Sequence, residues 1–120
     1  MNVLITGGAG FIGSHIAEEC VKRGHRVDVI DDLSTGKLTN LDKIKNKVNI
    51  FTSDITKKSA YKNLADDYEV IFHVAARASI PNSFNDPFGT SEQNIGGTLR
   101  ILEYAKKIGA KVIFSSSSSI

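Results

Sequence analysis

Near its start the chain reads Val3-Leu4-Ile5-Thr6-Gly7-Gly8-Ala9-Gly10-Phe11-Ile12-Gly13. A short apolar run leads into four glycines within seven residues, and an amphipathic segment follows at once. Glycine allows a sharp turn and lets a ligand approach the backbone where a Cβ would clash. The N–H groups that open a helix then face the space above the turn, where the helix dipole favours an anion such as a phosphate. This stretch therefore predicts a strand, a phosphate-binding turn and a helix.

Two glycine spacings fit the turn. Gly8, Gly10 and Gly13 match G-x-G-x-x-G, whereas Gly7, Gly10 and Gly13 match G-x-x-G-x-x-G. Neither match decides the function by itself, because a glycine-rich turn can also serve structure alone. The residues around the turn therefore have to show whether it binds a ligand.

The residues after the turn favour a dinucleotide. Apolar residues recur at the spacing of one helix face, namely Ile12, Ile16 and Cys20. Gly24 then ends the helix, and a second apolar strand over residues 26–30 leads into Asp31. Asp31 lies 18 positions after Gly13, close to the roughly 20 expected for the acid that binds the adenosine ribose. Together these features predict a dinucleotide-binding βαβ unit.

Composition narrows the class of protein. The 120 residues are enough for one domain at most, and the apolar fraction of 41% and charged fraction of 23% are ordinary for a soluble globular protein. The net charge of +2, with dispersed basic residues, does not indicate nucleic-acid binding. Cys20 is the single cysteine and is expected to be a buried structural thiol.

Targeting and metal signals are not found in the sequence. No segment has the length of a membrane span, and the N-terminus has no signal-peptide pattern, which predicts a cytoplasmic protein. His15, His25 and His73 are dispersed without metal-ligand spacing, so no metal site is predicted. His15 is expected to face solvent, and His73, at the end of a buried strand, is expected to hydrogen-bond to backbone.

The rest of the chain alternates between strands and helices. Further strands are expected at 48–51, 70–74 and 111–114, a short helix within 32–41, a polar helix over about 57–66, and a long helix from about 88 or 90 to 107. This alternation predicts an α/β fold with a doubly wound parallel sheet (Rossmann), strand order 3-2-1-4-5, covered on both faces. Residues 1–120 are thus expected to form one dinucleotide-binding domain.

Six segments carry a family resemblance. They are TGGAGFIGS (6–14), DDLSTG (31–36), DI (54–55), HVAA (73–76), NIGGT (94–98) and FSSS (114–117). In this order they resemble the extended short-chain dehydrogenase/reductases. Within that family they are most similar to nucleotide-sugar epimerases of the UDP-glucose 4-epimerase kind. The resemblance implies that residues 1–120 are an incomplete NAD-binding Rossmann domain, truncated before a sixth strand. It also implies a nucleotide-sugar substrate such as a UDP-sugar, and a homodimer for the full-length protein.

The resemblance also implies roles for individual residues. The implied cofactor-binding residues are Gly7, Gly10, Phe11, Ile12, Gly13, Asp31, Asp32, Asp54, Ile55, Ala75 and Ala76. In that set the glycines admit the pyrophosphate, and Asp54 and Ile55 contact the adenine. Ser117 aligns with the family's catalytic serine or threonine. Ser79 is implied to lie near the nicotinamide and the sugar, and Asn94 to support the active site.

Asp31 also bears on the choice of cofactor. A ribose diol donates hydrogen bonds to a carboxylate, whereas the 2′-phosphate of NADP would be repelled by it. Asp31 therefore favours NAD, although an acid at this position can also serve only as a turn or capping residue.

The reaction is harder to assign. The family's Tyr-x-x-x-Lys pair is absent, because Tyr61, Tyr68 and Tyr104 are followed four positions later by other residues than lysine: Ala65, Phe72 and Ile108. The chain is therefore expected to be the N-terminal part of a longer enzyme and to be inactive alone. Ser118 and Ser119 stand where the related dehydratases carry acids, which favours a 4-epimerase. The alternatives are a dehydratase or decarboxylase of the same family, or a non-catalytic NAD-binding or sensing module.

Overall fold

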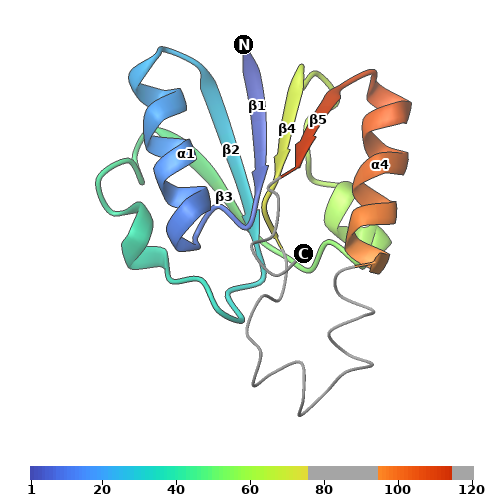
Figure 1. Cartoon of the computed structure of the whole chain (residues 1–120), viewed down its shortest axis with the longest axis horizontal. Helices are drawn as coiled ribbons and strands as arrows, with labels where there is room; N and C mark the ends of the chain where they lie inside the picture. The colour runs from blue at the N-terminus through green and yellow to red at the C-terminus, as the bar shows by residue number, and fades with distance from the viewer. Residues whose placement is uncertain (76–94, 115–120) are drawn as a thin grey trace.

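A parallel sheet organises the part of the chain that the computed structural model describes, residues 1–75 and 95–114. Within these residues its five strands are β1 (Asn2–Thr6), β2 (Arg26–Asp31), β3 (Val48–Thr52), β4 (Val70–His73) and β5 (Lys111–Phe114). They lie in the order β3-β2-β1-β4-β5, with every neighbouring pair parallel (Figure 1). The predicted doubly wound topology is therefore confirmed, with β1 at its centre.

Helices cover both faces of the sheet. The helix α1 (Phe11–Lys22) and the 3-10 helix η1 (Leu38–Leu41) lie on one face, and α4 (Gly97–Ile108) and the 3-10 helix η2 (Lys58–Tyr61) lie on the other (Figure 1). The central strands of such a sheet are buried on both sides, which explains the uninterrupted apolar runs Val3–Ile5 in β1 and Val70–Phe72 in β4.

Alternate side chains of each strand enter two separate cores. Val3, Ile5, Val27 and Val29 pack on the α1 face together with Ala17 and other residues of that helix. The intervening side chains pack on the α4 face, in a cluster that contains Leu4, Ile30, Ile71, Ile101 and Ala105. The strand period of two therefore divides the central strands between the cores.

The segment between β3 and β4 differs from expectation. The predicted helix over about 57–66 is wrong, because only the four-residue η2 forms, followed by turns. The chain is held instead by two tyrosine hydroxyls: Tyr61 donates to the carbonyl of Ile55 at 2.6 Å, and Tyr104 of α4 donates to the carbonyl of Ala65. With only a thin apolar stripe, a regular helix would gain little burial here.

A buried carboxylate joins β2 to its surroundings. Asp28 lies in the middle of β2 with 3% of its surface exposed. It accepts a hydrogen bond from the hydroxyl of Tyr68 and another, at 2.9 Å, from the side-chain amide of Asn49 on β3. Burial and the neighbouring Asp28 raise the pKa of Tyr68, so its phenol stays protonated and donates.

We expect the Tyr68→Phe variant to lose about 1.5–3 kcal/mol of unfolding free energy, because it deprives a buried carboxylate of a donor. Tyr61→Phe is the matched control, since it also loses only a hydroxyl, but one bonded to a neutral carbonyl; its expected loss is about 1 kcal/mol. Urea unfolding measures both values. Equal losses in the two variants would contradict the special role of Asp28.

Candidate dinucleotide-binding site

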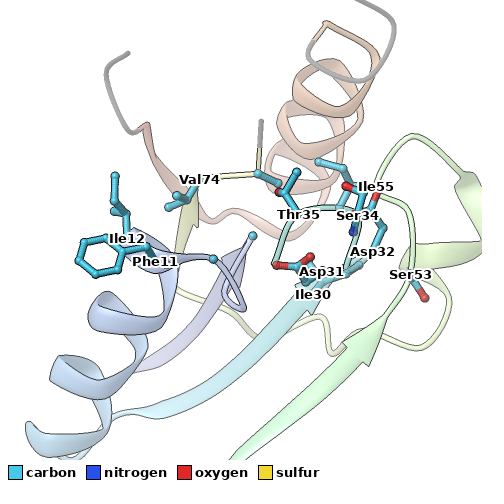
Figure 2. Close-up of a pocket in the computed structure, with 14 residues that line it drawn as sticks. Phe11, Ile12, Ile30, Asp31, Asp32, Ser34, Thr35, Ser53, Ile55 and Val74 are labelled. Carbon is cyan, nitrogen blue, oxygen red and sulfur yellow. The ribbon is translucent and has the colours of Figure 1, made fainter. Parts of the chain in front are cut away.

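A cavity of about 250 Å³ opens at the carboxyl end of the sheet, next to the start of α1. Its walls come from the ends of β1, β2, β3 and β4 and from the loops that follow them: Gly7, Gly10, Phe11, Ile12, Gly13, Ile30, Asp31, Asp32, Ser34, Thr35, Ser53, Ile55, Val74 and Ala75 (Figure 2). This edge is where open α/β sheets bind ligands, at the point where the strand order reverses.

The turn after β1 leaves no room for a Cβ at Gly7, Gly8 or Gly13. Gly7 has φ +71°, and a Cβ there would lie 2.8 Å from the backbone N and Cα of Ala75. A Cβ on Gly13 would lie 2.1 Å from the carbonyl oxygen of Gly7, so α1 can approach the turn only without a side chain. Gly8 instead packs on Val29 and does not line the cavity. The structure thus assigns the turn to the spacing Gly7-x-x-Gly10-x-x-Gly13.

The start of α1 presents backbone donors to this cavity. The first helical hydrogen bond of α1 runs from the N–H of Ser14 to the carbonyl of the N-cap residue, Gly10, at 2.9 Å. The N–H groups of Phe11, Ile12 and Gly13 therefore have no intrahelical acceptor, and the first turn carries no acidic side chain. These donors and the helix dipole favour an anion at this place.

Ile12 is not on the buried face where the helical spacing places it. It is 53% exposed and Phe11 is 74% exposed, and both line the rim of the cavity. Ser14 is buried instead, with its hydroxyl bonded to the carbonyl of Phe11 at 2.9 Å. The core-facing stripe of α1 consequently begins one residue later, at Gly13.

Asp31 lies at the centre of the cavity wall, between the start of α1 and the loop after β2 (Figure 2). One carboxylate oxygen accepts the N–H of Ala9 at 3.0 Å, and the other accepts the N–H of Leu33 at 2.8 Å. Asp31 is therefore a turn residue as well as a cavity residue. A carboxylate has about four lone-pair positions, so two backbone bonds leave acceptor capacity for hydroxyl groups of a ligand.

The loop after β2 is fastened to the glycine turn. The carbonyl of Ala9 accepts hydrogen bonds from the backbone of Lys37 at 3.0 Å and from the side-chain amide of Asn40 at 2.8 Å. Gly36 packs so closely that a Cβ would lie 2.9 Å from a carboxylate oxygen of Asp31. These contacts bring Ser34 and Thr35 into the cavity wall, although neither was predicted as a site residue from the sequence.

The remaining predicted residues on this side lie near the end of β3. Ile55 and Asp32 line the cavity. Asp32 accepts the N–H of Ser34 at 2.9 Å, and Asp54 accepts both the N–H and the hydroxyl of Thr56, at 2.9 and 2.7 Å. Asp54 is not among the cavity-lining residues. Its neighbour Ser53 does line the cavity, although the sequence analysis did not predict Ser53 as a site residue.

The opposite wall is formed by Val74 and Ala75, after β4. Their N–H groups donate to the hydroxyl of the buried Thr6, at 3.0 and 3.1 Å. The same hydroxyl contacts Nδ1 of His73 at 2.7 Å, and Nε2 of His73 contacts the hydroxyl of Thr98 at 2.9 Å. The expected backbone partner of His73 is therefore wrong, because both ring nitrogens meet threonine hydroxyls.

Several sequence predictions fall elsewhere. Ala76, Ser79, Asn94 and Ser117 lie outside the described residues. Among residues 1–75 and 95–114, no group of three or more His, Cys, Asp or Glu side chains is placed to hold a metal ion. In the same ranges, no helix combines the length and the apolar character that a membrane crossing requires.

The sheet order, the glycine turn at the start of α1 and the acid at the end of β2 together define a dinucleotide-binding domain of the Rossmann type. A comparison with protein families agrees with this class. The model of the NAD dependent epimerase/dehydratase family matches residues 3–120, and the chain belongs to this family. NAD is thus the cofactor of the family to which the chain belongs.

Similar proteins include both epimerases and decarboxylases. The chain is 40% identical over 117 residues to a UDP-N-acetyl-alpha-D-glucosaminuronate decarboxylase of Bacillus cytotoxicus, covering 98% of this chain and 36% of that protein. It is 38% identical over 121 residues to a UDP-glucose 4-epimerase of Mycolicibacterium smegmatis, covering 98% of this chain and 39% of that protein.

A solved structure of an epimerase is also similar to this chain. The UDP-glucose 4-epimerase of Thermus thermophilus, in complex with NAD, matches with a TM-score of 0.86 and 38% identity, over 98% of this chain and 38% of that chain. The chain therefore spans little more than a third of the length of the proteins that it resembles.

We expect Gly13→Ala to lower the unfolding free energy by about 3 kcal/mol, because its Cβ would overlap the Gly7 carbonyl and force the turn to move. Gly96→Ala is the control: Gly96 has helical dihedral angles and its nearest neighbour would lie 3.8 Å from the new Cβ. Thermal and urea unfolding compare the two. A Gly13→Ala variant as stable as Gly96→Ala would show that α1 does not need this close approach.

Proposed function

We propose that residues 1–120 are the NAD-binding domain of a nucleotide-sugar epimerase of the UDP-hexose 4-epimerase type. The observation that carries the proposal is the pairing of Asp31 with the glycine turn in one cavity. Because the chain spans little more than a third of its relatives, the substrate-binding part is proposed to lie outside these residues.

The cavity residues fit a dinucleotide in a definite orientation. Gly7, Gly10 and Gly13 line the cavity with backbone, and together with the backbone donors of Phe11 and Ile12 this surface suits a pyrophosphate. Asp31 accepts hydrogen bonds from the hydroxyls of the adenosine ribose, and its charge disfavours the 2′-phosphate of NADP. The nicotinamide half is then directed toward the opposite wall, at Val74 and Ala75.

The reaction that we propose is epimerisation at C4 of a UDP-hexose. NAD, held by the glycine turn and Asp31, would serve as a reversible hydride acceptor for C4 of the sugar. Ser117 is proposed to hydrogen-bond the reacting oxygen, with Ser79 and Asn94 near the sugar. Ser118 and Ser119 offer no carboxylate for an elimination step, and epimerisation needs none at this point.

Two other functions have support. The identity to a UDP-sugar decarboxylase favours a decarboxylase or dehydratase of the same family. The Rossmann-type fold by itself also allows a non-catalytic NAD-binding or sensing module. The two alternatives differ from the main proposal in products, so an assay separates them.

We expect Asp31→Asn to weaken NAD binding by about tenfold or more, through loss of charge-assisted hydrogen bonds to the ribose, while NADP binding stays constant or improves. Calorimetric titration with both nucleotides measures this ratio. The control Asp42→Asn removes the same charge from an exposed position outside the cavity and should change neither affinity. Unchanged NAD affinity, or equal losses for NAD and NADP, would leave Asp31 only its role in the turn.

We expect the 120-residue chain to bind NAD without converting UDP-glucose, because it lacks the tyrosine base. The protein encoded by the native gene should interconvert UDP-glucose and UDP-galactose, or a related C4 pair, without releasing carbon dioxide from UDP-glucuronate. Chromatography of the products measures both. Carbon dioxide release would favour the decarboxylase, no turnover by the native protein would favour the binding module, and turnover by the 120-residue chain would contradict the requirement for the tyrosine.

A further inference from the structure

His73 is the meeting point of three elements at the carboxyl edge of the sheet. It is the last residue of β4 and only 6% exposed. Thr6 at the end of β1 contacts one ring nitrogen and Thr98 in the first turn of α4 contacts the other. Phe114, the last residue of β5, meets the imidazole edge to face, with ring centroids 5.7 Å apart. The side chain thus contacts β1, α4 and β5.

The hydrogen-bond partners of Thr6 determine the tautomer of His73. A threonine hydroxyl has two acceptor lone pairs and one hydrogen. The N–H groups of Val74 and Ala75 both point at this oxygen and occupy its acceptor side, the former shared with the Thr6 carbonyl. The hydroxyl hydrogen is left to donate to Nδ1 of His73, so Nδ1 is unprotonated. The ring proton is therefore on Nε2, which donates to Thr98.

Burial supports this neutral form. Removal from water lowers the pKa of His73, because a charged imidazolium loses its hydration in the sheet edge. In a protonated ring, Nδ1 would also carry a hydrogen and would donate to the Thr6 hydroxyl. This third donor would compete with the N–H groups of Val74 and Ala75 for the two lone pairs of the hydroxyl oxygen. In the neutral Nε2–H tautomer, Thr6 accepts from both backbone N–H groups and donates to Nδ1, and Nε2 donates to Thr98.

The network continues into the cavity wall. Val74 and Ala75, whose N–H groups are held by Thr6, line the cavity opposite Asp31. Gly7 packs against the backbone of Ala75 with no room for a Cβ. The position of this wall, and its fit to the glycine turn, therefore depend on the orientation of the Thr6 hydroxyl.

We propose that His73, in its Nε2–H tautomer, is a positioning residue for the nicotinamide half of the cofactor site. It orients the hydroxyl of Thr6, which places the Val74–Ala75 wall, and it couples this wall to the first turn of α4 through Thr98. The proposal rests on the proposed NAD-binding function, because that function assigns the adenosine half to Asp31 and the nicotinamide half to this wall.

The tautomer is tested directly by the ¹⁵N chemical shifts of the imidazole nitrogens in the full chain, with His73→Gln to assign the signals. We expect a protonated Nε2 and an unprotonated Nδ1 at neutral pH. A proton on Nδ1, in either the other tautomer or the charged ring, would overturn the proposal. This measurement requires no cofactor and no activity.

The positioning role is tested with Thr98, which is only partly buried and can be changed without altering the ring. Thr98→Val removes the acceptor of Nε2–H but keeps the side-chain shape, whereas Thr98→Ser keeps the hydroxyl and is the matched control. The probes are NAD and ADP, because ADP has the adenosine and pyrophosphate groups and lacks the nicotinamide half. Calorimetric titration of the full chain measures both affinities.

We expect Thr98→Val to weaken NAD binding by up to about tenfold, the equivalent of one lost hydrogen bond, with ADP binding unchanged. Thr98→Ser should bind both nucleotides as the unmodified chain does. Equal losses for NAD and ADP, or no loss at all, would overturn the positioning role. If the unmodified chain bound neither nucleotide, the NAD-binding function would fall and the positioning role with it, while the NMR spectrum would still decide the tautomer.

Discussion

The close approach of α1 to the end of β1 is the constraint on which the site depends. The carbonyl of Gly7 occupies the place where a side chain on residue 13 would stand. This contact sets where the helix begins, and so where its backbone donors point. The same turn brings Gly7 against Ala75, so the position of the wall after β4 follows from it. A change of one methyl group at this contact therefore reaches both sides of the cavity.

Ala9 extends this arrangement to the adenosine side. Its N–H donates to Asp31 and its carbonyl accepts from Lys37 and Asn40, so a single residue of the turn holds both the acid and the loop behind it. The cavity is consequently built from two hydrogen-bonded halves that share the glycine turn.

Features encoded by local patterns were predictable from the sequence. The strand order, the place of α1 and the position of Asp31 follow from apolar runs, glycine spacing and the distance between Gly13 and the acid. Features that depend on contacts between distant residues were not. The segment after β3 is held in part by Tyr104, 39 positions from its acceptor Ala65, and Thr6 lies 67 positions before its partner His73. Ser34 and Ser53 line the cavity, and both lie shortly after the end of a strand. Their positions after predicted strands could therefore have identified them as site residues.

The two cores on the faces of the sheet differ in the length of sequence that their residues span. Among the described residues, the buried members of the α1-side core lie between Val3 and Ile44, whereas those of the α4-side core extend from Leu4 to Ala105. During synthesis from the N-terminus, these residues of the α1-side core are all present once Ile44 has been added. At that point α4, which contributes Ile101 and Ala105 to the other core, has not yet been synthesised. Contacts of short sequence separation also have the smaller loop-closure cost. The half of the fold that carries the glycine turn and Asp31 is therefore expected to take shape on the emerging chain before the wall that faces it.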